Sequence, residues 1–189
     1  MRLVLASRNP HKLRELEPLL APHELEPLPD DLELPPETGE TFADNALIKA
    51  RAVAQATGKP TLADDSGIAA VALGGRPGVR SARYAGERAT DEDNLAKLLR
   101  EVPDDGDRRV AYVCALAYVN GHEELLVEGR CEGTLTSEPR GSRGFGYDPA
   151  FVPADDDSGR TMAELSPEEK DAISHRGRAA RALREKLPA

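Results

Sequence analysis

Residues 61–67, with the sequence Thr-Leu-Ala-Asp-Asp-Ser-Gly, constrain the fold more than any other stretch of the chain. A short apolar run leads into the adjacent carboxylates of Asp64 and Asp65, as in a strand that delivers acidic side chains to the edge of a sheet. Neighbouring carboxylates repel each other, but a hard divalent cation prefers carboxylate oxygens as ligands. The stretch therefore indicates either a strand end that holds a metal ion or a solvent-exposed turn.

The first twenty residues predict a strand that runs into a helix. Residues 2–6 are mostly apolar and form the strand. Ser7 or Asn9 can cap the helix, and Pro10 suits its first turn. Free backbone N–H groups at such a helix start favour an anion, to which Lys12 adds an ammonium group. The pattern indicates a phosphate site, although a capped surface helix that carries a lysine has the same pattern.

Residues 42–57 predict a second helix. Asn45 and Lys49 are four positions apart and share one face of it. That face is either solvated or lines a cleft, with Lys49 facing phosphates and Glu37 facing a metal ion. A strand, two helices and a second strand in this order are typical of an α/β fold.

Residues 109–119 and 123–136 are strand-like and meet at Asn120-Gly121, which is a strong hairpin signal. An antiparallel pair makes the predicted sheet mixed rather than purely parallel. The 189 residues are enough for one domain, or for one domain with two lobes around a cleft.

Residues 141–151 combine three glycines with three aromatic residues, in a chain that has only three Phe, four Tyr and no Trp. Glycine lets a backbone approach a ligand closely. An aromatic ring beside it can stack on a planar base, which stabilises binding by about 1–3 kcal/mol. The segment predicts a base-binding loop, and the alternative is a glycine-rich loop whose rings fill the core.

Residues 166–186 predict two helices with a break between them. Ser166 caps the first helix, and Ser174 can cap the second. Lys170, His175 and Arg176 then meet backbone donors at the break. The alternative is a charged C-terminal helix.

The formal net charge of −9 argues against non-specific nucleic-acid binding, which needs a basic surface. A local cationic pocket or a metal ion can still attract a small anionic substrate. Cys114 and Cys131 lie in strand-like runs and are expected to be reduced core thiols, which fits a cytoplasmic protein. The N-terminus has no long apolar segment, so we expect neither a signal peptide nor a membrane span.

Five segments thus offer phosphate, metal or base chemistry, each at the expected end of an element. Open α/β sheets bind ligands at such ends. A substrate that matches all five has a planar ring, several phosphates and a divalent ion. A nucleoside triphosphate with Mg²⁺ fits this description.

Six motifs occur in one order along nearly the whole chain: Ser7-x-Asn9-x-x-Lys12, Glu37-Thr38-Gly39-x-Thr41-Phe42-x-x-Asn45-Ala46-x-x-Lys49-Ala50, Ala63-Asp64-Asp65-Ser66-Gly67, Gly78-Val79-x-Ser81-Ala82-Arg83-Tyr84, Gly144-Phe145-Gly146-Tyr147-Asp148-Pro149-x-Phe151 and Ser174-His175-Arg176-Gly177. Together they resemble the inosine triphosphate pyrophosphatase family (Ham1/RdgB-like). The resemblance implies hydrolysis of ITP, dITP and XTP to the monophosphate and pyrophosphate, which removes deaminated purines from the nucleotide pool. It also implies Mg²⁺ dependence, a homodimer, and a two-lobed fold of residues 1–189 with a long mixed sheet, flanking helices and a central active-site cleft.

On this resemblance, Glu37 and Asp65 hold Mg²⁺, and either Asp65 or Asp64 takes a proton from the attacking water. Lysines clamp the phosphates, and the segment 145–148 selects the base together with residues at the helix break. The predicted substrate-binding residues are Ser7, Arg8, Asn9, Pro10, His11, Lys12, Lys49, Ser66, Phe145, Gly146, Tyr147, Asp148, Lys170, His175 and Arg176. Two rival functions stay open, a Maf-type nucleotide pyrophosphatase that prefers pyrimidine or modified nucleotides and a nucleotide-binding regulatory module without turnover.

Overall fold

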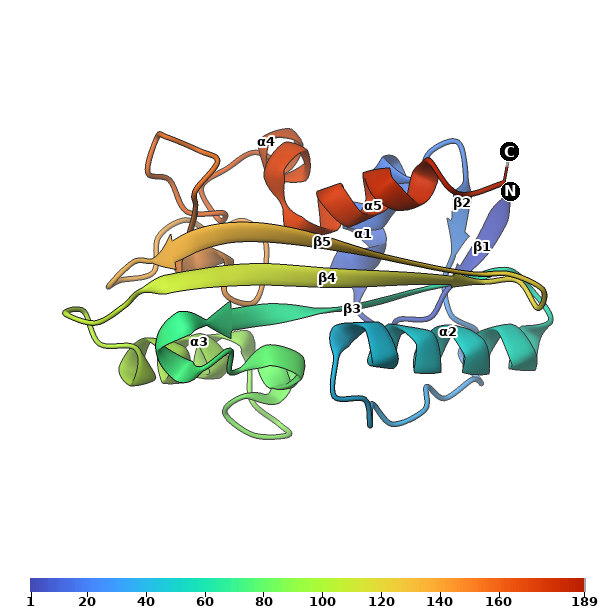
Figure 1. Cartoon of the computed structure of the whole chain (residues 1–189), viewed down its shortest axis with the longest axis horizontal. Helices are drawn as coiled ribbons and strands as arrows, with labels where there is room; N and C mark the ends of the chain where they lie inside the picture. Colours follow the sequence, from blue (N-terminus) through green and yellow to red (C-terminus); the bar gives the residue numbers. More distant parts are fainter. Residues whose placement is uncertain (189) are drawn as a thin grey trace. The chain divides into compact units, whose positions relative to one another are not determined.

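The computed structural model of the chain describes residues 1–188 and contains a mixed sheet with the strand order β2-β1-β3-β4-β5-β6 (Figure 1). β1 pairs in parallel with β2 and β3, and β5 pairs antiparallel with β6, so the predicted α/β class and mixed sheet are confirmed. In chain order the elements are β1 (Arg2–Leu5), α1 (Pro10–Leu19), β2 (Glu24–Glu26), α2 (Phe42–Thr57), β3 (Thr61–Ala70), η1 (Val71–Leu73), η2 (Gly78–Arg83), α3 (Asp91–Glu101), β4 (Arg109–Val119), β5 (Glu124–Leu135), η3 (Asp148–Ala150), β6 (Phe151–Pro153), α4 (Pro167–Ile173) and α5 (His175–Arg184).

The chain divides into two compact units, and β3, β4 and β5 each contribute residues to both. The first unit comprises Met1–Asp65, Cys114–Gly129 and His175–Ala189, and the second comprises Ser66–Val113 and Arg130–Ser174. Each unit has a hydrophobic core of its own. That the whole chain acts as one domain stays a prediction.

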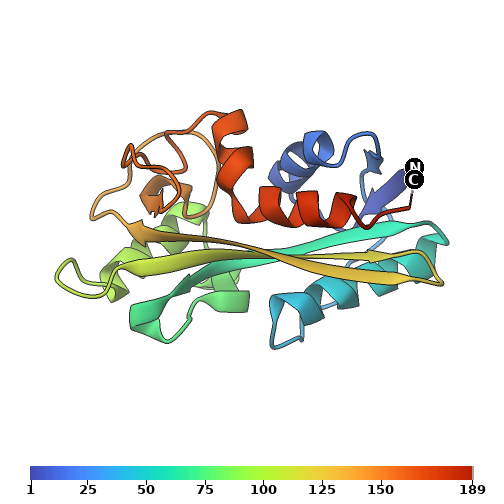
Figure 2. The same cartoon turned by 45° about the horizontal axis from the view of Figure 1, so that its top comes forward.

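In the first unit, successive side chains of one strand pack on opposite faces. Leu3 and Leu5 of β1 belong to a core that includes residues of α1 and α5, whereas Val4 and the next residue, Ala6, pack with α2. This alternation follows from the pleat of a strand, and a strand that is buried on both faces has a continuous apolar sequence. Figure 1 shows α2 on one face of these strands and α1 and α5 on the other, and Figure 2 also shows α1 beside α5.

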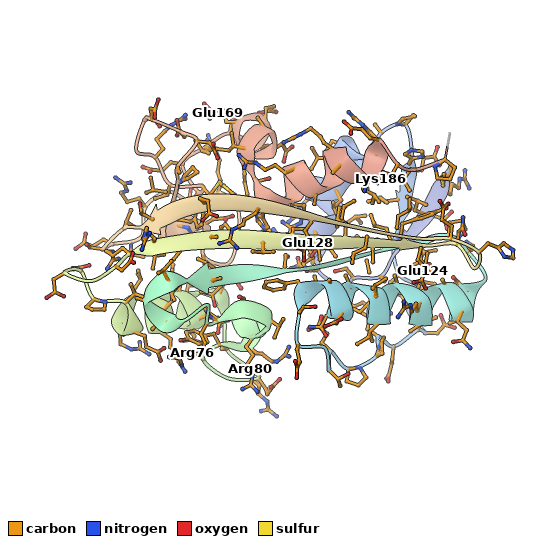
Figure 3. The ribbon with its side chains drawn as sticks, viewed as in Figure 1. Arg76, Arg80, Glu124, Glu128, Glu169 and Lys186 are labelled. Carbon is orange, nitrogen blue, oxygen red and sulfur yellow. The ribbon has the colours of Figure 1, made fainter. Side chains whose placement is uncertain are left out.

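Helix α2 has the bounds that the sequence predicts. The Thr41 side chain accepts a hydrogen bond from the backbone N–H of Asp44, and Asp44 accepts one from Thr41, which completes a capping box. Gly58 ends the helix at a φ of 67°, a left-handed conformation that favours glycine. On its exposed side, Arg51 donates to Glu124 of β5 at 2.8 and 2.6 Å, and Glu124 is labelled in Figure 3.

In the second unit, α3 packs its apolar side against the strands. Its residues Leu95 and Leu98 share a core with Ile68 of β3. The rings of Tyr112 and Phe151 stack in the same core, with their centres 4.4 Å apart. The aromatic residues of the predicted loop therefore divide, because Phe151 belongs to the core.

Helix α4 starts as the sequence predicts. Ser166 accepts a hydrogen bond from the backbone N–H of Glu169, whose carboxylate accepts one from Ser166. Glu169, labelled in Figure 3, also pairs with Arg160 at 3.0 Å. Ser174, predicted to cap the following helix, has extended backbone and ends α4.

The prediction that Asp64 and Asp65 end a strand is wrong, and so is the alternative of a solvent-exposed turn. β3 runs from Thr61 to Ala70, and both carboxylates are buried in it. The strand that ends near these two acids is the neighbouring β1. Its last residue, Leu5, pairs with Leu62. The two acids therefore lie just beyond the point where β3 loses its parallel neighbour, while their own strand continues.

Among residues 1–188, none of the helices combines the length and the apolar character that crossing a bilayer requires.

Candidate active site

The turn from β1 into α1 resolves the choice of helix cap in favour of Asn9. Its Oδ1 accepts a hydrogen bond from the backbone N–H of His11 at 2.9 Å, and its own N–H donates to Ser7 Oγ at 3.2 Å. Pro10 is the first helical residue. The predicted polar helix start is therefore present, with Lys12 in the first turn of the helix.

Arg8 and His11 have local partners in this turn. The Arg8 guanidinium donates to the carbonyl oxygens of Leu28 at 2.9 Å and Leu32 at 2.7 Å, so it holds the segment after β2. The His11 ring contacts Arg14 at 2.9 Å. Their predicted role as substrate-binding side chains stays a prediction.

Asp64 is a fully buried carboxylate with cationic partners on both oxygens. Lys12 Nζ forms an ion pair with Oδ1, and Arg176 Nε lies 2.9 Å from Oδ2. The Cys114 thiol also donates to Oδ2, at 3.2 Å. Burial alone raises the pKa of Asp64, but the charges of Arg176 and Lys12 outweigh it and hold the pKa well below its usual value. Asp64 is therefore ionised and saturated with donors.

Arg176, predicted to contact the base, is 2% exposed and lies in this network. Its Nη1 is 2.5 Å from Oε2 of Glu15, which lies on α1. Burial alone lowers the pKa of Arg176, but Asp64 and Glu15 hold it above its ordinary value. In this structure the guanidinium connects α5 to α1 and β3, and its contact with a base stays a prediction.

Asp65 lies in a different environment from its neighbour. Lys49 Nζ contacts Asp65 Oδ1 at 3.1 Å and Glu37 Oε1 at 2.7 Å, so that one ammonium group connects two carboxylates. The other oxygen of Asp65, Oδ2, is buried and has no hydrogen-bond partner among residues 1–188. Burial raises the pKa of Asp65, and the pull of Lys49 does not offset burial and the nearby charge of Glu37. Asp65 thus keeps an oxygen ready to bind a cation or a proton.

The predicted metal ligands agree with the donor set of a Mg²⁺ site. Mg²⁺ is usually bound through one or two carboxylates, with substrate phosphates and waters completing its shell. Glu37 and Asp65 supply two carboxylates around one ammonium group, and Asp65 Oδ2 has no other partner in the described part of the chain. Within the same residues, no group of three or more His, Cys, Asp or Glu side chains is arranged to hold a metal ion by itself.

In the second unit, Asp148 organises the predicted base-binding loop. Its Oδ2 accepts hydrogen bonds from Lys170 Nζ at 2.7 Å and from the Phe145 backbone N–H at 3.0 Å. Its Oδ1 accepts one from the Tyr112 hydroxyl at 3.1 Å. Lys170 Nζ also lies 5.3 Å from the centre of the Phe145 ring. The loop backbone, a cation and an aromatic ring are therefore tied to one carboxylate.

Two glycines make this loop possible. Gly144 has a φ of 74° and Gly146 a φ of 63°, which disfavour any other residue. The Gly146 N–H donates to Asp91 at 2.8 Å. The Tyr147 ring is buried and its hydroxyl donates to the Ser81 carbonyl at 2.7 Å, so its side chain packs in the core.

The contacts described above divide the predicted residues between the two units. The first unit connects Glu37, Lys12, Lys49, Asp64, Asp65 and Arg176, and also holds the polar segment Ser7, Asn9 and Pro10 and the buried His175. The second connects Phe145, Asp148 and Lys170, and also holds Gly146, Tyr147 and the half-buried Ser66.

Three contributors are absent from the sequence-based prediction. Glu15 lies three positions after Lys12, which places both on one face of α1. Tyr112 and Cys114 are two positions apart on β4, so both side chains point to the same face of the strand. These spacings are signals, but they do not say which carboxylate each side chain meets.

A family model described as the Ham1 family matches residues 3–186. The dITP/XTP pyrophosphatase of Mycobacterium tuberculosis (strain ATCC 25618 / H37Rv) is 50% identical over 191 residues, which cover 94% of this chain and 91% of that protein. The dITP/XTP pyrophosphatase of Pectobacterium atrosepticum is 48% identical, with 98% of each chain covered.

Solved structures agree. The Ham1 protein of Staphylococcus aureus matches with a TM-score of 0.88 and 37% identity, over 99% of this chain and 98% of that one. A HAM1 protein from Coxiella burnetii matches with a TM-score of 0.86 and 45% identity, with the same coverage. The order of the six motifs, the mixed sheet and these similarities lead to one conclusion: the chain belongs to the Ham1 family.

Proposed function

We propose that this protein hydrolyses dITP, XTP and ITP to the nucleoside monophosphate and pyrophosphate, and so removes deaminated purines from the nucleotide pool. Family membership and the names of its relatives support this activity. The observation that carries it is Asp65, a buried carboxylate with one oxygen unpartnered in residues 1–188, beside Glu37 and Lys49. This is the arrangement that activation of a water molecule next to a polyphosphate requires.

In this proposal Asp65, and not Asp64, is the general base. Both oxygens of Asp64 already accept from cations, and its pKa is well below the usual value, so it has little tendency to take a proton. The pKa of Asp65 is raised, and its Oδ2 has no competing donor in the described chain. Asp64 instead fixes the Lys12 ammonium group.

Glu37 and one oxygen of Asp65 would hold a divalent ion, for which we propose Mg²⁺, while the other oxygen of Asp65 would take the proton. When bound, such an ion lowers the pKa of a coordinated water and neutralises charge on the phosphates. Lys49 lies against both carboxylates and supplies a further positive charge for the polyphosphate. Lys12 and the polar start of α1 add to this positive charge, because positioning and charge neutralisation dominate phosphoryl chemistry.

The segment 145–148 is proposed to select the base. Hypoxanthine and xanthine carry an oxygen at position 6, where adenine carries an amino group, so a fixed donor favours the first two. Asp148 immobilises the loop backbone and Lys170, which makes such donors rigid. Sites built on hydrogen bonds discriminate by up to about 10⁴-fold. His175 and Arg176 remain proposed base contacts.

We further propose that the protein is a homodimer, that it is cytoplasmic and that it does not bind nucleic acid. The net charge of −9 disfavours a nucleic-acid surface. The two cysteines of the chain, Cys114 and Cys131, are buried and form no disulfide, as expected in a reducing compartment. The dimer is proposed from the family resemblance.

The test is an assay of the purified protein with Mg²⁺ and dITP, XTP, dATP, dGTP or dTTP, in which pyrophosphate and phosphate are measured separately. We expect pyrophosphate and monophosphate as products, and a kcat/KM for dITP and XTP at least about 100-fold above that for dATP. Asp65→Asn serves as a control for contaminating phosphatases. Equal rates on all five nucleotides, a preference for dTTP, or binding without turnover would contradict the proposal.

A further inference from the structure

The side chain of Asn45 is buried with one of its donors unused. Asn45 lies in the first turns of α2 and is 0% exposed. Its Oδ1 accepts a hydrogen bond from the backbone N–H of Gly39 at 2.8 Å. Because that N–H requires an oxygen, the bond defines which side-chain atom is Nδ2. This Nδ2 is buried and has no hydrogen-bond partner within residues 1–188.

A second helix start shows that this unused donor is not a property of the local sequence. Thr41 to Asn45 and Thr90 to Asn94 share the pattern Thr-x-x-Asp-Asn, and both helices begin with the same capping box. Asn94 is 2% exposed, but its Oδ1 accepts from Ala85 at 2.7 Å and its Nδ2 donates to Ala82 at 3.2 Å. The same motif therefore has both amide atoms bonded in α3 and only one in α2.

The bond to Gly39 fixes the segment that carries Glu37. A Cβ at Gly39 would lie 2.5 Å from Asp44 Cβ and 2.8 Å from Asn45 Oδ1, so the backbone is in close contact with the start of α2. On the far side of Gly39, the capping box of Thr41 holds the chain to the same helix turn. Glu37 is only two residues before Gly39, so its position depends on this contact.

Asn45 also shares a helix face with Lys49, which contacts both metal-binding candidates. Lys49 lies four positions further along α2, which places it on the same face, and its Nζ contacts both Glu37 and Asp65. Buried polar groups without hydrogen-bond partners are rare in folded proteins, and a bound water or ion is one explanation for them. Here an unused donor and the unused Oδ2 of Asp65 occur in one unit.

We propose that Asn45 is a positioning residue for divalent-cation binding. Its Oδ1 holds the Glu37 segment in place, and its Nδ2 would donate to a water of a hydrated cation held by Glu37 and Asp65. Mg²⁺ keeps several waters in protein sites, so oxygen acceptors arrive with it. The inference rests on the proposed function in one respect, the role of Glu37 and Asp65 as cation ligands.

The donor is tested by NMR of side-chain amide groups during a Mg²⁺ titration of the full chain without nucleotide. The Asn45 signal pair is identified by its loss in Asn45→Ala, and the Asn94 pair by its loss in Asn94→Ala. We expect the Asn45 pair to shift and saturate with Mg²⁺ while the Asn94 pair stays in place. An Asn45 pair that does not move, or that moves no more than the Asn94 pair, overturns the inference.

The positioning role is tested with Mn²⁺ as a probe, whose free concentration is measured by electron paramagnetic resonance. We expect Asn45→Ala and Gly39→Ala each to raise the Mn²⁺ dissociation constant at least about tenfold, because both release the Glu37 segment. Asn94→Ala, the matched control, leaves the constant unchanged although it lowers the urea midpoint. Unchanged Mn²⁺ binding in folded Asn45→Ala overturns the inference, as does a wild-type protein that binds no Mn²⁺. Hydrolysis of dITP, measured in parallel, reports separately on the proposed function.

Discussion

Asp64 in the first unit and Asp148 in the second are both buried carboxylates, at 0% and 3% exposure, but their partners differ in kind. Asp64 is neutralised by two cations, Lys12 and Arg176. Asp148 has one cation, Lys170, and takes its remaining hydrogen bonds from a backbone N–H and a hydroxyl. The first carboxylate thus balances charge, and the second holds a loop in shape.

This difference indicates what each network can do. A network of cations and carboxylates sets the local charge, which suits a polyphosphate and a metal ion. A carboxylate that immobilises backbone donors sets a hydrogen-bond pattern, which suits the discrimination of one planar base from another. Substitutions in the first network should therefore change rate or stability, and those in the second should change selectivity.

The largest effect is expected for Asp65→Asn. The amide cannot accept a proton from water and is a poorer cation ligand, so kcat for dITP should fall by about 10³-fold or more. Steady-state kinetics with saturating Mg²⁺ measure this loss. The exposed Asp31→Asn is the matched control and should retain wild-type kcat. A kcat within tenfold of wild type would show that Asp65 is not the base.

Asp64→Asn should be the most destabilising change in this network. It leaves the buried Arg176 and the half-buried Lys12 without the carboxylate charge between them, and breaking a buried pair typically lowers the free energy of unfolding by about 3–5 kcal/mol. Urea unfolding followed by circular dichroism measures it. Its kcat should fall less than that of Asp65→Asn, and the opposite order would transfer the role of base to Asp64.

The sequence predicts those features that depend on near neighbours in the chain. The capping box of Thr41 and Asp44, the cap at Asn9 and the hairpin at Asn120-Gly121 each involve residues within a few positions of one another.

Features that depend on distant partners are not predictable in this way. Asp64 lies in mid-strand because β3 continues beside β4 after β1 has ended opposite Leu62, and the lengths of neighbouring strands are not encoded at residue 64. Arg8 belongs to a substrate motif, yet its guanidinium holds carbonyl oxygens of a loop twenty residues away. The spacing of Glu15 from Lys12 places both on one face of α1, but it does not reveal that Arg176 lies beside Glu15.

Asp148→Asn tests the second network. The amide keeps the shape of the side chain but weakens the bonds to Lys170 and to the Phe145 N–H, so the loop should lose its rigidity. We expect kcat/KM for dITP to fall by about 10- to 100-fold, and the preference for dITP over dATP to shrink with it. Competition kinetics with both nucleotides measure this ratio. An equal loss on dITP and dATP would mean that Asp148 supports catalysis in general and not base selection.

The smallest effect is expected for Tyr112→Phe, which removes one neutral donor from Asp148 and keeps the ring that stacks on Phe151. The free energy of unfolding should fall by about 1–2 kcal/mol, since Lys170 and the Phe145 N–H remain bonded to the carboxylate.

Tyr118→Phe, in the same strand, is the control. It also removes a tyrosine hydroxyl, but this hydroxyl contacts the neutral amide of Asn120 and not a carboxylate. If the free energy of unfolding, measured in urea, falls equally in both variants, the charge of Asp148 does not strengthen its hydrogen bond with the Tyr112 hydroxyl. The second network would then depend on Lys170 in the way that the first depends on Lys12 and Arg176, and the distinction between a charge-balancing carboxylate and a loop-holding one would fail.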